Sequence, residues 1–364
     1  MIYLDNAATT QPTKRALEIY QQAQHQLFYN SESLHIGGEK VKNALTQART
    51  FVQQYFQSTK EVLFGTSGSH ANEIAIHLYL KHQTSGQVWV SPYEHPSITA
   101  ALEAYRDRLE IQTIPLTEMG EIDIPTFQTL VTEQTVLIIT QHVNSETGYI
   151  LPIQQIAQIA KQWSIPFHVD GVQAVHKVRS ISIDSFTSYS FSGHKIHGTK
   201  GSGVLMIDYA HIHPYNAHYF HEQGVRNGTM DVPSILATVQ ALSEPSDYNH
   251  LHRLYQHAVQ RATELGFRIL KYNAQAPHIL GLITPKYEGQ YMMQMLSNRN
   301  ICISTGTACG HGILMSNGVT QKIKASDGEV YQYIRVSFAS FTTFEEIDTC
   351  FDVMANILYE GGSQ

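Results

Sequence analysis

The feature that most constrains the fold is a regular alternation of short apolar runs and longer amphipathic stretches, which continues to about residue 240. The runs of strand length are Glu61–Phe64, Gln87–Ser91, Glu110–Pro115, Thr135–Thr140, Ile165–Val169, Ser188–Phe191 and Gly203–Ile207. Stretches with a helical period lie at Glu39–Tyr55, Ala71–Lys81, Pro96–Arg106, Ile124–Val131 and Pro152–Trp163. This strand–helix–strand repetition predicts an α/β fold, a mainly parallel seven-stranded sheet with helices on both faces.

The pattern changes after about Pro245. A long helix is expected at Asp247–Leu265, short strands near Phe267–Leu270 and Ile279–Thr284, and two more helices at Gln290–Ser297 and Thr343–Leu358. The 364 residues are enough for two domains. We therefore expect a large domain over 1–250, with residues 1–15 as a segment that can pack on the small domain. Residues 251–364 are expected to form a smaller α+β domain.

Composition excludes several classes of protein. The chain is 42% hydrophobic and 15% charged, with a net charge of −7 and no long block of Lys or Arg. Nucleic acid and membranes are therefore not expected partners. No run of about 18 apolar residues exists, and the start of the chain does not resemble a signal peptide. Three cysteines are too few for a disulfide framework, so a cytoplasmic protein is expected.

Two strand ends carry residues suited to one cofactor. Lys195 follows a predicted strand within Ser190–Lys195, in a segment poor in charge, where it is a candidate Schiff-base amine. The alternative is a solvated loop lysine. Asp170 ends another apolar run, and a buried carboxylate needs a cationic partner such as a protonated pyridine nitrogen. Gln173, three residues later, could reach a phenolic oxygen.

A third strand end, Gly65–His70, precedes a predicted helix. Glycines and small hydroxyl residues at a helix N-terminus form a site for anions. Alone this motif is weak, since many helices begin with a serine cap. Together, a phosphate cradle, a carboxylate and a lysine describe a pocket for pyridoxal phosphate.

The chain resembles the cysteine desulfurases (NifS-like), in the class V branch of the fold-type I pyridoxal phosphate enzymes, over nearly its whole length. The motifs that carry the resemblance are Tyr3–Thr10, Thr66–Gly68, Glu94–Pro96, Glu146–Gly148, His168–Gln173, Ser192–Lys195, Arg226–Thr229, Ser304–Cys309 and Ile334–Phe338. The resemblance implies a homodimeric enzyme that releases L-alanine from L-cysteine. It would pass the sulfur to an acceptor protein or a small thiol. Iron–sulfur cluster assembly, tRNA thiolation and a vitamin pathway all stay open as destinations.

The resemblance also implies roles for individual residues. Lys195 would form the Schiff base with the cofactor and later move the Cα proton. Asp170 would keep the pyridine nitrogen protonated, and His95 would stack on the ring and carry protons. Gln173 would contact the ring oxygen. Cys309 would attack the sulfur as a thiolate and hold it as a persulfide.

Further positions match cofactor or substrate contacts. Phosphate or ring contacts are implied for Gly68, Ser69, His70, Ser192 and His194. Thr229 matches a phosphate contact that the second subunit donates, and Asn144 and Ser145 stand where a cofactor-contacting asparagine is usual. Arg335 matches the guanidinium that grips the substrate carboxylate, a bidentate task suited to arginine. Asn30 stands where relatives carry an active-site asparagine.

Several positions depart from the family pattern. His70 occupies a place usually held by glutamate, and Ser145 one usually held by asparagine. The bulky run His218–Phe220 replaces a glycine-rich segment and is expected to reshape the approach to the substrate. Two alternatives therefore stay open, a class V lyase or transaminase acting on another amino acid, and a degenerate paralogue that serves as a scaffold.

Other polar residues are expected to have structural roles. No metal site is expected, because the histidines that cluster before the Arg-x-Gly-Thr motif lack a clean ligand spacing. These histidines are His211, His213, His218 and His221. Cys302 and Cys350 fit buried small hydrophobic residues.

Overall fold

The structure is a computed structural model that describes residues 1–364 except 180–181, 216–217, 306–315, 324–328 and 361–364. Its centre is a seven-stranded sheet in the order β2-β8-β7-β6-β5-β3-β4. The strands are β2 (Glu61–Gly65), β3 (Gln87–Val90), β4 (Glu110–Thr113), β5 (Thr135–Gln141), β6 (Phe167–Asp170), β7 (Ser188–Ser192) and β8 (Gly203–Ile207). β8 runs antiparallel to both of its neighbours, and the other pairs are parallel. The predicted α/β fold and its mainly parallel sheet are confirmed.

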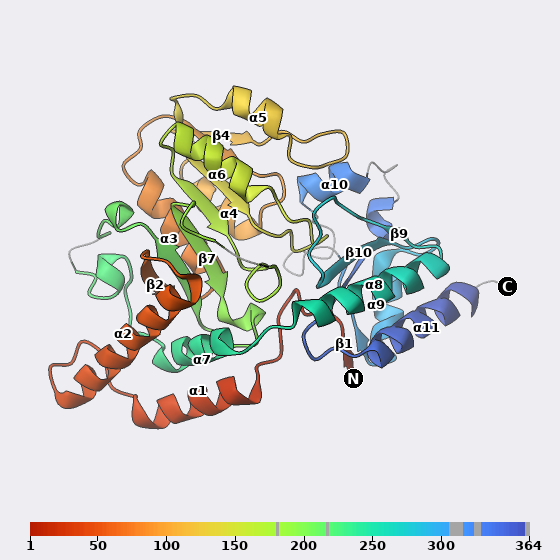
Figure 1. The fold of residues 1–364 in the computed structure, drawn as a ribbon, viewed down its shortest axis with the longest axis horizontal. Helices are drawn as coiled ribbons and strands as arrows, with labels where there is room; N and C mark the ends of the chain where they lie inside the picture. Colours follow the sequence, from red (N-terminus) through yellow and green to blue (C-terminus); the bar gives the residue numbers. More distant parts are fainter. Residues whose placement is uncertain (180–181, 216–217, 306–315, 324–328, 361–364) are drawn as a thin grey trace.

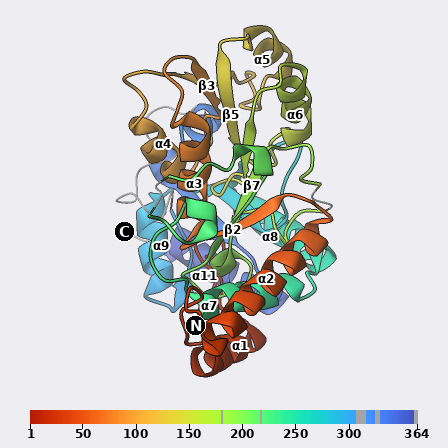
Figure 2. The same ribbon diagram turned by 90° about the vertical axis from the view of Figure 1, so that its left-hand side faces the viewer.

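Helices cover both faces of this sheet (Figures 1 and 2). One face packs against α3 (Gly68–Leu80) and α4 (Pro96–Glu103), and the other against α2 (Ile36–Phe56), α5 (Ile124–Leu130), α6 (Ile153–Gln162) and α7 (Val232–Ser243). Successive strand residues alternate between the two layers, as a pleated strand requires. In β2, Leu63 belongs to the first core, whereas Val62 and Phe64 belong to the second.

The C-terminal part forms its own apolar core. Here β12 (Tyr333–Ser337), β10 (Ile279–Ile283) and β9 (Arg268–Ile269) make an antiparallel sheet. The helices α8 (Tyr248–Glu264), α9 (Gly289–Ser297) and α11 (Phe344–Glu360) supply most of the remaining core. The chain also contains α10 (Asn317–Ile323).

The start of the chain belongs to this C-terminal core. β1 (Ile2–Tyr3) pairs in parallel with β11 (Ile301–Cys302), and Leu4 is fully buried among the C-terminal core residues. In Figure 1 the N-terminus accordingly lies beside β1, near the C-terminal helices. Residues 5–13 therefore connect the two cores.

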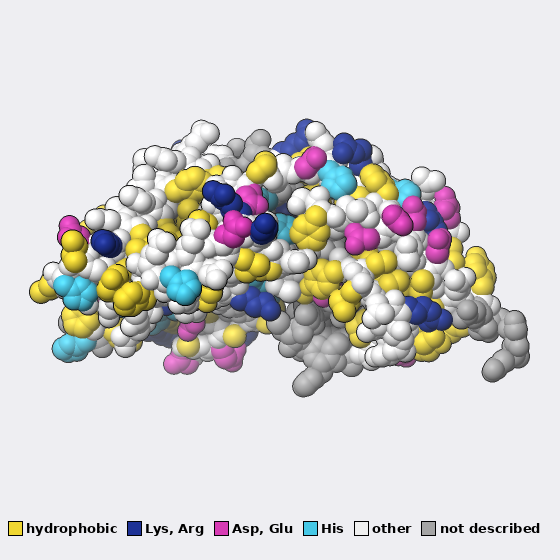
Figure 3. Space-filling view, turned by 90° about the horizontal axis from the view of Figure 1, so that it is seen from below, with side chains coloured by type: hydrophobic (Ala, Val, Ile, Leu, Met, Phe, Trp, Pro, Cys, Tyr) yellow, Lys and Arg dark blue, Asp and Glu magenta, His cyan; other side chains and the backbone are white. Residues whose placement is uncertain are grey.

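Three helices were not expected from the sequence, α1 (Lys14–Gln26), α7 and α10. The residues of α1 are mostly polar, and only its small residues Ala16 and Ala23 are buried. Small side chains let α1 lie close against α7. The segment between α1 and the start of α2 exposes three apolar side chains, Phe28, Leu34 and Ile36. Leu34 is fully exposed, and the other two are more than 60% exposed. Apolar side chains are visible at the left end of Figure 3, where α1 and α2 lie.

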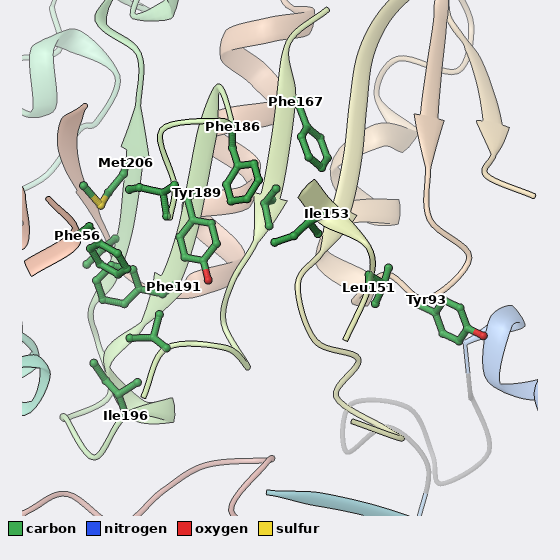
Figure 4. Packing of buried hydrophobic residues seen from close by; sticks show 14 of the residues in the cluster. Phe56, Tyr93, Leu151, Ile153, Phe167, Phe186, Tyr189, Phe191, Ile196 and Met206 are labelled. Carbon is green, nitrogen blue, oxygen red and sulfur yellow. The ribbon is translucent and has the colours of Figure 1, made fainter. Parts of the chain in front are cut away.

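Aromatic side chains fill the second core beneath the middle of the sheet. Phe167, Phe186, Tyr189 and Phe191, labelled in Figure 4, are each at most 1% exposed, and the ring of Phe186 contacts those of Phe167 and Tyr189. Phe56 of α2 packs on two of these rings. This packing holds β6 and β7 rigidly, so the residues at the ends of these strands have defined positions.

Candidate active site

The largest convergence of polar side chains lies at one edge of the sheet. Six strands of this sheet, β2 to β7, run in the same direction and end at this edge. A cavity of about 220 Å³ lies there. It is lined by Ala7, Ala8, Ser67, Gly68, Ser69, Asn72, His95, Ser97, Gln141, Val143, Ser145, Asp170, Val172, Gln173, Ser192, His194, Lys195 and Arg335. Ligands bind at the carboxyl ends of strands in such sheets, as predicted here.

Asp170, the last residue of β6, is held in place by two donors. The Asn72 amide Nδ2 donates to its Oδ2 at 2.8 Å, and the backbone N–H of Val172 donates to Oδ1 at 2.9 Å. Asn72 is itself held, because its Oδ1 accepts hydrogen bonds from Ser190 and His168. The carboxylate is buried and ready to accept one more hydrogen bond, from a protonated nitrogen in the cavity.

Lys195 ends a single 3₁₀ turn, η1 (Gly193–Lys195), directly after β7. Its Nζ donates to the carbonyl oxygens of Ala7 at 2.6 Å and Ala8 at 2.8 Å. Residues 7 and 8 belong to the connecting segment at the start of the chain. The amine therefore lies on the cavity wall between the two cores.

Gln173 joins the cavity to a buried polar cluster behind it. Its Nε2 donates to the carbonyl of Ala7 at 2.7 Å, and its Oε1 accepts from Lys177 Nζ and from His278 Nε2, both at 3.4 Å. Burial, and to a smaller extent the charge of Lys195, lowers the pKa of Lys177 to about 7. Burial also lowers the pKa of His278 well below its usual value, so this imidazole is neutral.

His95 caps the N-terminus of α4. The backbone N–H of Ser97 donates to its Nδ1 at 3.1 Å. Nδ1 therefore carries no proton, and Nε2 carries the proton in the neutral ring. Burial and the charge of Lys195 lower the pKa of His95, although Asp170 opposes this shift. A neutral imidazole with its proton on Nε2 is suited to moving protons near neutral pH.

The N-terminus of α3 forms the end of the cavity that suits an anion. Ser67 caps the helix through its Oγ, and the first amide groups of a helix have no partner within it. A Cβ on Gly68 would lie only 2.7 Å from Val172 Cγ2, so only glycine fits here. Ser192 and His194 lie on the same wall. Burial, followed by the charge of Lys195, lowers the pKa of His194 to about 3.

Arg335, in β12, brings a guanidinium from the C-terminal core into the cavity. Its Nη1 donates to the carbonyl of Ser145 and its Nη2 to Asp5 Oδ1, both at 2.7 Å. The Nε atom is buried and has no partner among the described residues. Since an unpartnered buried donor is costly, this nitrogen is ready to bind an acceptor such as a carboxylate.

The structure thus brings most of the predicted site residues to one cavity. These are Gly68, Ser69, His95, Ser145, Asp170, Gln173, Ser192, His194, Lys195 and Arg335. Asn144 and His70 lie next to it but do not line it. The Asn144 Oδ1 caps the following turn by accepting from the N–H groups of Glu146 and Thr147. His70 turns back to Thr66, whose N–H donates to the imidazole Nδ1 at 3.2 Å.

Two predicted site residues lie elsewhere. Thr229 and Asn30 are exposed and do not line the cavity. Cys309 lies outside the described residues. The bulky residues His218–Phe220 do not line the cavity either, and Phe220 is 72% exposed.

Sequence reasoning missed three residues that act on the site. Asn72 positions Asp170, Asp5 pairs with Arg335, and Lys177 lies behind Gln173. Asp5 falls within the motif Tyr3–Thr10 that carries the family resemblance, which was a usable signal, whereas Asn72 lies four residues beyond the motif Thr66–Gly68. Lys177 follows His176 after the Asp170 motif, and nothing local distinguishes it from a surface lysine.

The described part of the chain holds neither a metal cluster nor a membrane-spanning helix. No group of three or more His, Cys, Asp or Glu residues there could hold a metal ion. Among the same residues, no helix is long and apolar enough to cross a membrane.

Comparison with known proteins places the chain in a family. The model of the family described as aminotransferase class-V matches residues 2–350. "Putative cysteine desulfurase NifS" of Bacillus subtilis (strain 168) is 32% identical, with 96% of this chain and 92% of that protein covered. "Cysteine desulfurase NifS" of Azotobacter vinelandii is 28% identical, with 95% and 90% covered.

Solved structures show the same fold. A structure titled "NIFS-LIKE PROTEIN" superposes with a TM-score of 0.89 at 24% identity, over 98% of this chain and 99% of that one. Another, titled "SspA in complex with cysteine", superposes with a TM-score of 0.82 at 25% identity, over 94% and 100%. The chain therefore belongs to the class-V aminotransferase family. Within this family it is a NifS-like enzyme that depends on pyridoxal phosphate.

The cavity fits this cofactor. The glycine at position 68 leaves room for a phosphate at the N-terminus of α3. Asp170 offers an acceptor to a pyridinium nitrogen, and Lys195 offers an amine to an aldehyde. Gln173 and His95 lie on the walls between these groups. Nε of Arg335 is a further buried donor on this cavity that has no partner among the described residues.

Proposed function

We propose that this protein is a cysteine desulfurase that converts L-cysteine to L-alanine and passes the sulfur on through Cys309. The observation that carries this proposal is the convergence of Lys195, Asp170 and Arg335 on one cavity. The amine and the carboxylate suit pyridoxal phosphate, and the guanidinium suits the α-carboxylate of an amino acid. The names of the relatives and of the cysteine-bound structure support cysteine as the substrate.

The residues of the cavity would divide the work as follows. Bound pyridoxal phosphate supplies an electron sink for the charge left on Cα when its proton is removed. Lys195 Nζ, once displaced from the cofactor by the substrate amine, takes that proton. Asp170 accepts a hydrogen bond from the pyridinium nitrogen and so maintains its charge. His95 Nε2 donates or receives the protons that the substrate needs on the opposite side.

Cys309 is proposed as the sulfur acceptor. Its thiolate attacks the substrate sulfur, so that the Cβ–S bond breaks and an S–S bond forms. Cβ takes up a proton in place of sulfur, and L-alanine leaves while Cys309 holds a persulfide. The overall atom balance is closed, because cysteine and a thiol give alanine and a persulfide.

The described residues on either side of Cys309 support this role. Ser304 exchanges two backbone hydrogen bonds with Arg335, at 3.1 and 2.7 Å. On the other side, the N–H of Ser316 donates to the carboxylate of Glu146 at 3.1 Å. Glu146 follows Ser145, which lines the cavity. The chain on both sides of Cys309 is therefore attached close to the site.

The test is the formation of alanine from L-cysteine by the cofactor-loaded protein, with a reducing thiol present to release the sulfur. Cys309→Ala should abolish alanine formation, whereas the matched variant Cys302→Ala should retain it. Mass spectrometry without the thiol should find one added sulfur atom on Cys309. A coloured, cofactor-bound wild type that makes no alanine would overturn the proposal and favour another amino acid as the substrate of a class V lyase or transaminase.

We also propose that the active unit is a homodimer. Thr229 and Asn30 are both exposed and so could serve a cavity in the other subunit. His221 Nδ1 lies 3.6 Å from Glu32 Oε1, which joins the segment before Thr229 to the chain around Asn30. The exposed apolar side chains of that same stretch support burial against a second copy. Sedimentation of the purified protein at twice the subunit mass is the expected result.

Three further assignments complete the proposal. We propose that the large domain covers residues 1–250 and the small domain residues 251–364. The separate apolar core of the C-terminal part supports this division. The sulfur acceptor is proposed to be a protein or a small thiol. A cytoplasmic location is supported by the free thiols of Cys302 and Cys350.

A further inference from the structure

Asp5 forms an ion pair with the guanidinium of Arg335. Asp5 Oδ1 accepts from Nη2 at 2.7 Å, and the two residues are 330 positions apart in the chain. The side chain of Arg335 is 3% exposed and that of Asp5 is 18% exposed. A pair this well shielded from water retains most of its electrostatic interaction.

The position of Asp5 is rigidly defined. It forms a β-bridge with Ser337, and the Tyr3 hydroxyl donates to its carbonyl at 3.0 Å. The neighbouring Asn6 donates to the carbonyl of Ser337. The carboxylate therefore cannot leave Arg335 without moving the segment that also supplies Ala7 and Ala8 to the cavity wall.

The pairing has a consequence for any anion that binds in the cavity. Nη1 is engaged by the Ser145 carbonyl and Nη2 by a full negative charge, which leaves Nε as the buried unpartnered donor. An incoming carboxylate meets a guanidinium whose charge is already neutralised. Its attraction to Arg335 is opposed by repulsion from Asp5 at the far side of the same group.

We propose that Asp5 is a specificity-determining residue that weakens and orients the binding of carboxylates at Arg335, so that the site selects a single α-carboxylate and releases it readily. This inference rests on the proposed role of Arg335 in holding the substrate carboxylate. Asp5 acts through Arg335 and is not a catalytic residue. The pairing disfavours ligands with a second negative charge, because each added charge meets the same repulsion.

The test is calorimetric titration of the cofactor-loaded protein with propionate, malonate and propionamide, which carry one, two and no carboxylates, respectively, and cannot react through an amine. Malonate is the dianion, propionate the monoanion and propionamide the neutral match. In Asp5→Asn the amide oxygen can still accept from Nη2, but the negative charge is gone. We expect propionate to bind at least about fivefold more tightly than in the wild type. The affinity for malonate should increase by about the square of that factor, and the affinity for propionamide should not change.

Three variants complete the test. Asp5→Glu keeps the charge and should stay within about twofold of the wild type. Asp208→Asn removes an equal charge from an ion pair with Lys60 that does not line the cavity, and should leave all three affinities unchanged. Asp5→Ala is the second neutral variant, and it should show the same gains in affinity as Asp5→Asn. It takes the place of Asp5→Asn in the test if the Asp5→Asn protein does not fold.

Several outcomes would overturn the inference. These are unchanged or weaker propionate binding in a neutral variant, equal gains for propionate and malonate, or failure of both neutral variants to give folded, cofactor-loaded protein. The last result would make Asp5 a requirement of the fold. None of these titrations needs turnover, so a wild type that binds propionate as expected but forms no alanine would overturn only the proposed function.

Discussion

Replacing Asn72 with aspartate exchanges one NH₂ group for an oxygen at the deepest wall of the cavity. The Oδ1 atom, which accepts from Ser190 and from His168 at 3.1 Å, stays an acceptor. The lost group is Nδ2, which donates to Asp170 Oδ2 at 2.8 Å. The variant therefore places two carboxyl groups in contact in a buried place, since Asn72 is 1% and Asp170 5% exposed.

The cost of Asn72→Asp follows from this geometry. Two carboxylates about 4 Å apart repel by about 4 kcal/mol at an effective dielectric constant near 20. The folded protein can avoid this by retaining one shared proton, which costs about 1.4 kcal/mol for each pH unit above an ordinary carboxyl value near 4. Both routes give a loss of about 4 kcal/mol in the free energy of unfolding at pH 7. At pH 5 the loss should shrink to about 1.5 kcal/mol, because a protonated carboxyl restores the hydrogen bond.

The sign of the pH dependence is set by proton counts. Above pH 4 the unfolded chain has lost the proton that the folded carboxyl pair retains, so the folded state binds more protons. The stability of the variant must therefore fall, relative to the wild type, as pH rises from 5 to 7.

The assay is urea denaturation of the cofactor-free wild type and of the variant at pH 5 and pH 7. Asn273→Asp is the matched control, because Asn273 Nδ2 also donates to a carboxylate, Glu121 Oε2, at 2.8 Å but is exposed. Its effect should be less than about 1 kcal/mol. A loss for Asn72→Asp that is below about 1 kcal/mol at pH 7, or that does not change with pH, would refute the reasoning.

Two further predictions concern the ends of the cavity. Gly68→Ala puts a Cβ 2.7 Å from Val172 Cγ2, so α3 must shift. Equilibrium dialysis should show that the variant binds pyridoxal phosphate at least about tenfold more weakly than the wild type. Equal affinity would contradict the phosphate site. Lys177 has a pKa of about 7 in the folded protein because of burial, and an ordinary value when unfolded. The unfolded chain therefore binds more protons between pH 7 and 10, so this group makes wild-type stability rise with pH. Lys177→Met should flatten that rise in the melting temperature, and an unchanged slope would show that Lys177 is not buried as a neutral amine.

The strands of the central sheet could be predicted because their signal is local. Each strand reads as a short continuous apolar run because both of its faces are buried, as Leu63 and Phe64 show by facing different cores. The strand ends were equally visible, and Asp170 and Lys195 reach the same cavity because parallel strands end at one edge. Tertiary structure was not needed to locate this chemistry.

The helix α1 shows where local reasoning fails. Its residues are mostly polar, and its contact with α7 depends on two small side chains, Ala16 and Ala23. Few large apolar residues mark such a helix, because its buried stripe is narrow and made of alanine. The stability of α1 therefore comes from tertiary packing, which the sequence pattern does not reveal.

The sequence by itself determined the layered sheet, the edge at which ligands bind and the amine and carboxylate that meet there. These follow from periodicity and from strand direction, which neighbouring residues specify. Only the tertiary structure decided which distant groups are partners. Asn72 holds Asp170 from 98 positions away, and Asp5 neutralises Arg335 from 330 positions away. The Asn72 contact depends on how α3 packs on the sheet, and the Asp5 contact depends on how the start of the chain joins the C-terminal core. No local pattern encodes either arrangement.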